Sequence, residues 1–67
     1  MKNIIYNGMT LEQIKNNLPA NMPDIHKKQY INNCIEVYNN EKNGINLGYC
    51  ECVRNTNFNL IKIYNNL

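Results

Sequence analysis

Residues 45–64 read INLGYCECVRNTNFNLIKIY, and the period of their apolar residues determines the fold class. Alternate positions from Ile45 to Val53 carry Ile, Leu, Tyr, Glu and Val, which approximates the two-residue period of a β-strand. Residues 54–57 are polar and typical of a turn, and residues 58–64 form a second β-prone run. Two such runs around a short turn predict an antiparallel β-hairpin at the C-terminal end.

Upstream, the sequence predicts a short strand followed by a capped helix. Residues 4–8, Ile-Ile-Tyr-Asn-Gly, combine a β-prone run with an Asn-Gly turn signal. Thr10 is a favourable N-cap, and Gln13 stands three residues later, as a capping box requires. Apolar residues at spacings of three and four then predict a helix over residues 11–18, which Pro19 ends.

A second, longer helix is predicted from residue 23 to residue 42. Pro23 suits a first helical turn, and Asn43-Gly44 suits a left-handed C-terminal cap. The predicted buried stripe recurs at i, i+3, i+4 and i+7, and consists of Ile31, Cys34, Ile35 and Tyr38.

These elements predict a small α+β domain in the order β-α-α-β-β, with residues 4–6 pairing at one edge of the sheet. The apolar face of the sheet is expected to cover the helix stripes, giving two layers. With 67 residues the chain is expected to form one compact domain, 1–67, near the lower size limit for a single apolar core.

Composition limits what individual residues can reveal. Asparagine accounts for 16 residues, and Asn, Ile, Lys and Tyr together for 36, all encoded by AT-rich codons. The net charge of +2 and a single arginine are weak for a dedicated duplex-DNA binder. No signal-peptide pattern or membrane-length apolar run is recognisable, and three cysteines do not suggest a disulfide framework. We expect a cytoplasmic protein with reduced thiols, acting inside a host cell and away from membranes.

The cysteines raise the question of a zinc site. In the predicted strand, Cys50 and Cys52 point to the same face, and Cys34 and His26 would complete a Cys3His ligand set. The last two residues are isolated from paired ligands, so the spacing is atypical of structural zinc. We expect no cofactor, and keep a zinc-stapled interaction domain as an open alternative.

Six residues are the candidates for contact with a partner. Tyrosine is enriched in protein–protein interfaces, and Tyr30 falls outside the predicted stripe of its helix. The basic residues at the start of the second helix can contact phosphate groups. The candidates are Tyr30, Tyr49, Tyr64, Lys27, Lys28 and Arg54. Codon bias toward tyrosine, and a solvated basic helix face, are the competing explanations.

Catalysis finds little support in the sequence, which contains one histidine, no serine and no Gly-rich phosphate loop. By elimination, we expect a non-enzymatic protein that binds a macromolecule, most simply a protein, stoichiometrically. Small AT-rich chains are common among phage and mobile-element accessory proteins, which suggests an anti-defence (anti-CRISPR-like) inhibitor of a host enzyme or nuclease. A small nucleic-acid-binding regulator that uses the basic start of the second helix is the alternative. Homodimerisation through the edges of the predicted hairpin is also open.

Overall fold

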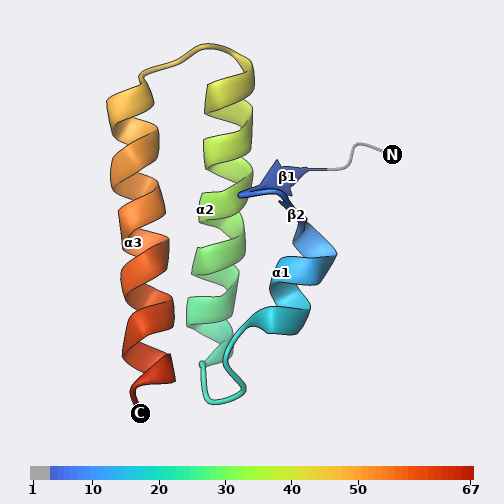
Figure 1. Ribbon diagram of the computed structural model, residues 1–67, viewed down its shortest axis with the longest axis vertical. Coiled ribbons are helices and arrows are strands. Elements are labelled where there is room, and N and C mark those ends of the chain that lie inside the picture. The colour runs from blue at the N-terminus through green and yellow to red at the C-terminus, as the bar shows by residue number, and fades with distance from the viewer. Residues whose placement is uncertain (1–3) are drawn as a thin grey trace.

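The body of the protein is a pair of long antiparallel helices. The computed structural model describes residues 4–67, and within them the order is β1 (Ile5–Tyr6), β2 (Met9–Thr10), α1 (Leu11–Asn17), α2 (Asp24–Lys42) and α3 (Leu47–Asn65). Helix α2 lies between α3 on one side and α1 on the other, and the small β-hairpin lies beside α2 (Figure 1). None of the helices described combines the length and apolarity needed to cross a lipid bilayer.

The predicted C-terminal hairpin is wrong, because residues 47–65 form helix α3. The buried and half-buried side chains of this segment recur at helical spacing and are Cys50, Val53, Asn57, Leu60, Ile61 and Tyr64. The apparent alternation over residues 45–53 was short, and it placed Glu51 among the inward-facing positions. The predicted β-α-α-β-β order with a two-layer sheet is therefore replaced, in the described residues, by a mainly helical fold with one small hairpin. A homodimer through C-terminal hairpin edges has no structural basis.

The N-terminal strand is present, but its partner is adjacent in sequence. Strands β1 and β2 pair antiparallel, with Tyr6 opposite Met9. The turn residues Asn7 and Gly8 have φ of 51° and 77°, the positive values that two-residue hairpins of type I′ need. The hairpin holds Tyr6 against the helices, where only 3% of its surface is exposed.

The start of α1 confirms the predicted capping box. The amide of Thr10 donates to Gln13 Oε1 at 3.0 Å, and the amide of Gln13 donates to Thr10 Oγ1 at 3.2 Å. The helix ends at Asn17, with Leu18 as its C-cap, one residue earlier than predicted.

The turn between α2 and α3 is also built from local caps. Gly44, with φ of 70°, donates to the carbonyl of Glu41, and Ile45 donates to that of Asn40 at 2.8 Å. This pair of bonds is a Schellman motif, which confirms the left-handed cap predicted at Asn43-Gly44. Asn46 then caps α3, since its side chain accepts a hydrogen bond from the amide of Tyr49 at 3.2 Å. Such a short turn makes the two helices antiparallel neighbours.

The α2–α3 interface contains a buried pair of amides at its centre. Asn57 is fully buried and Asn33 is 6% exposed. Asn33 Nδ2 donates to Asn57 Oδ1 at 2.9 Å, while Asn57 Nδ2 donates to the carbonyl of Tyr30 at 3.3 Å and contacts Cys34 Sγ at 3.4 Å. Among the described residues, no buried side-chain nitrogen or oxygen lacks a partner. A buried polar contact of this kind specifies the register of two helices.

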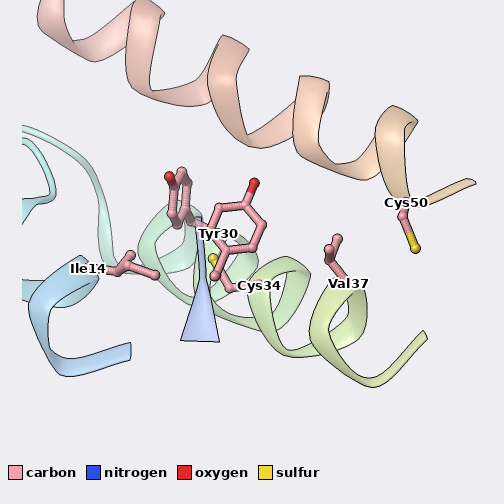
Figure 2. Close-up of a cluster of buried hydrophobic side chains, with 6 residues drawn as sticks. Ile14, Tyr30, Cys34, Val37 and Cys50 are labelled. Atoms are coloured by element: carbon pink, nitrogen blue, oxygen red, sulfur yellow. The ribbon is translucent and has the colours of Figure 1, made fainter. Parts of the chain in front are cut away.

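The apolar core lies next to this amide pair and is formed by side chains from β1, α1, α2 and α3. Its buried members are Tyr6, Ile14, Tyr30, Cys34, Val37 and Cys50, five of which are labelled in Figure 2. The rings of Tyr6 and Tyr30 meet edge to face, with centroids 6.5 Å apart. The buried face of α2 is thus rotated from the predicted stripe, and Ile31, Ile35 and Tyr38 are only half-buried. The buried face of α2 is rotated because α2 packs against α3 on one side and against α1 and the β-hairpin on another.

We predict that Asn57→Ala lowers the free energy of unfolding by about 2 to 3 kcal/mol, because it leaves the buried amide of Asn33 without its partner. Urea unfolding followed by circular dichroism measures the loss. Asn59→Ala, at an exposed position of the same helix, is the control and should change stability by less than about 0.5 kcal/mol. Replacing both amides with leucine should cost less than the single change, since neither amide is then left unpaired. Equal effects at positions 57 and 59 would contradict the assigned role.

Candidate functional site

A groove lies between α1 and α2 on the described surface. Its volume is about 330 Å³, and it is lined by Lys15, Leu18, Lys27, Lys28, Ile31 and Asn32. Leu18 ends α1 and Ile31 belongs to α2, and both are half-buried against the core. The three lysines border this apolar surface from both helices. We call this feature the lysine groove.

A second, more open hollow of about 580 Å³ adjoins the lysine groove around the start of α2. Asp24, Ile25, Lys27 and Lys28 line it, so the two lysines border both hollows. Ile25 is 74% exposed there. The first turns of α2 therefore present apolar surface and positive charge together.

Within residues 4–67, no salt bridge involves the lysines of the groove, although Asp24 lies one turn before Lys27 and Lys28 and lines the adjoining hollow with them. The one ion pair found there joins Arg54 on α3 to Glu41 near the C-terminal end of α2, away from the lysines at the start of that helix. Lys27 and Lys28 also lie near the N-terminal end of α2, where the helix dipole disfavours cations. Three lysines without a salt bridge thus border a partly apolar surface.

Of the six predicted contact residues, only Lys27 and Lys28 come together at this groove. The expectation that Tyr30 is exposed is wrong, since it is 7% exposed and packs in the core between α2 and the hairpin. Arg54 serves the fold, because its guanidinium lies 4.9 Å from the centre of the Tyr6 ring and binds the side chains of Asn7 and Glu41.

The other two predicted tyrosines lie near opposite ends of α3. Tyr49 is 44% exposed and its hydroxyl donates to the carboxylate of Glu36. Tyr64 is half-buried and its hydroxyl is hydrogen-bonded to Nδ1 of His26, while its carbonyl accepts a bond from Asn21 Nδ2 at 3.0 Å. These tyrosines form no joint surface with the lysine groove.

The four candidate zinc ligands are not brought together. Residues two apart in a helix are rotated by about 200° and so point to nearly opposite sides, which is why Cys50 is buried and Cys52 exposed. His26 lies eight residues before Cys34 on α2, about 12 Å along the helix axis. In the described part of the chain, no three His, Cys, Asp or Glu side chains cluster closely enough to hold a metal ion.

Sequence reasoning missed four groove residues: Lys15, Leu18, Ile31 and Asn32. Three of them were placed on the correct helix and Leu18 one residue inside the end of α1, but the groove depends on how α1 crosses α2, and no local pattern reports that angle. Compared with protein-family models, curated proteins and solved structures, the chain finds no match.

We predict that Cys52 is the one cysteine that a thiol reagent modifies in the folded protein. Cys34 and Cys50 are 0% and 2% exposed, and burial raises the pKa of the Cys34 thiol to about 11, so little reactive thiolate forms. Intact-mass measurement after brief iodoacetamide treatment at pH 8 should show one adduct, and three after addition of urea. Two or three adducts without denaturant would show that the core is open.

We also predict that stability falls as the pH rises above 9. Burial raises the pKa of Cys34 from 9.0 to about 11 and that of Tyr30 from 10.0 to about 12. The fold therefore favours the protonated forms, and their contribution is complete below pH 9 and is lost as the pH approaches 12. The urea midpoint should fall between pH 9 and 11, and a midpoint that stays constant over this range would contradict the burial of both groups.

Proposed function

We propose that this protein acts by stoichiometric binding and that the lysine groove receives an acidic, amphipathic segment of a protein partner. The observation that carries the proposal is the combination of three unpaired lysines with an apolar surface formed by Leu18 and Ile31. An apolar side chain of the partner would pack on Leu18 and Ile31. Carboxylates of the partner on either side of that side chain would pair with the lysines. Helices with one apolar face bind grooves in this manner.

The chemistry of the groove favours a protein over a nucleic acid. Its lining offers lysine but no arginine for bidentate base recognition, and no aromatic ring on which a base could stack. Apolar floor residues match a leucine or isoleucine of a peptide better than they match a phosphate backbone. A nucleic-acid-binding regulator using Lys27 and Lys28 is the alternative that the experiment below discriminates.

A binding role also fits the character of the lining, which consists of lysine, leucine, isoleucine and asparagine without a nucleophile–base pair. We further propose that the partner is a host enzyme or nuclease that the protein inhibits, in the manner of a phage or mobile-element accessory protein. The support for this step is the small size and AT-rich codon composition. Free thiols, one of them exposed, suit the reducing interior of a cell, where we place this binding.

The test uses a fluorescent 16-residue amphipathic helical peptide, with leucines at i, i+4 spacing flanked by glutamates, and measures binding by anisotropy. Reversing Lys27 and Lys28 to glutamate should weaken binding about tenfold or more, because two attractive pairs become repulsive. Reversing Lys42 and Lys62, which lie outside the groove, changes the net charge equally and should alter binding less than about twofold. The methyl resonances of Leu18 and Ile31 should shift on titration.

The same proteins are titrated with a mixed-sequence 20-nucleotide single strand and with its duplex. Binding of either one more tightly than the peptide, with a steep loss of affinity as salt rises, would favour the regulator and overturn the protein-partner proposal. Absence of peptide binding at millimolar concentration, or equal losses in the two double variants, would also overturn the assignment of the groove.

A further inference from the structure

The lysine groove and the second hollow form one continuous surface over the start of α2, because Lys27 and Lys28 line both of them. Lys27 is half-buried, which a lysine achieves by packing its aliphatic stem against apolar neighbours while its ammonium group stays at the surface. The boundary between the two hollows is therefore partly apolar. A segment bound in the groove can continue into the second hollow without leaving the surface of α2.

Apolar and basic side chains alternate along this surface. Ile25, Lys28 and Ile31 follow one another at intervals of three residues, the spacing of one kind of ridge by which helices pack. Their positions place Ile25 and Ile31 about 9 Å apart along the axis of α2 and about 120° apart around it. Two apolar contacts thus lie roughly 10 Å from each other, with a lysine midway between them.

The two ends of the surface carry opposite charges. Lys15, on α1, borders the end formed by Leu18 and Ile31. Asp24 borders the end formed by Ile25, and it is the one acidic residue among those that line the two hollows. A bound segment is therefore favoured when it presents carboxylates to the lysines and a cation to Asp24. The order of its charges matters as well as their sum.

We propose that the two hollows are a single docking site for a helical segment with two apolar anchors, and that Asp24 and Ile25 select this segment. The inference rests on the proposed function and specifies the chemistry of the partner. Residues seven apart in a helix share one face at a separation of about 10.5 Å, which matches the spacing of Ile25 and Ile31. The segment carries large apolar residues at this spacing, acidic residues midway between them, and basic residues beyond the anchor that meets Ile25.

Two fluorescent helical peptides of equal composition test the proposed order with the full chain. The matching peptide has leucines seven positions apart, two glutamates midway between them and two lysines in the turn beyond the second leucine. The transposed peptide exchanges the glutamates and the lysines. The protein should bind the matching peptide about tenfold more tightly, because transposition converts attractive pairs into repulsive ones. Equal affinities for the two peptides would overturn the inference.

The second anchor is tested by Ile25→Ser, which should weaken binding of the matching peptide about tenfold because an apolar contact is lost. Ile45→Ser is the matched control. Ile45 is 50% exposed and follows the far end of α2, so this change should leave binding unaltered. Circular dichroism checks that both variants remain folded, and equal effects of the two changes would contradict a contact at Ile25.

A charge exchange tests Asp24 directly. Replacing the two lysines of the matching peptide by glutamates should weaken its binding to the wild-type protein about fivefold, and Asp24→Lys should reverse this preference. Binding that is lost on reversing Lys27 and Lys28 but unchanged by Ile25→Ser and Asp24→Lys would overturn this inference and leave the proposed function standing. Failure of every peptide to bind at millimolar concentration would overturn both.

Discussion

The hydrogen bond between Asn33 and Asn57 constrains the rest of the molecule, because both amides are removed from water and each needs a partner. Sliding α3 along α2 by one turn would break this bond and leave Asn33 Nδ2 without its acceptor in the interface. The register that joins them also brings Tyr64 to His26 near one end of the helix pair and Tyr49 to Glu36 toward the other. A modest apolar core is thus supplemented by a polar contact that only one arrangement of the two helices satisfies.

The placement of α3 determines which surface of α2 stays open. With α3 along one side of α2, the seven-residue helix α1 packs on the other side and covers only part of it (Figure 1). The surface left open includes Ile31 and the lysines at the start of α2. The sequence predicted a sheet over the helices, and that prediction is wrong. The proposed contact surface is instead formed by shallow hollows whose lining is apolar and mainly basic.

Local chemistry explains which elements could be predicted. The start of α1 and the end of α2 were predictable to within one residue because a capping box and an Asn-Gly cap act over a few residues. Helix α3 begins at an equally local cap, Asn46, but asparagine is so abundant here that one more carries little information. Its central buried position is Asn57, which a hydrophobicity pattern counts as turn or surface. The helical period was therefore interrupted at the residue that matters most to the interface.

The candidate site was predictable only in part for the same reason. Lys27 and Lys28 stand out as a basic pair in the sequence, and Ile31 lies beside them one turn later on the same helix, but Leu18 reaches them only through tertiary packing. That packing is set by the linker 19–23, in which Met22 is 3% exposed and anchors the turn between α1 and α2. The groove therefore depends on a crossing of two helices that no local pattern in the sequence encodes.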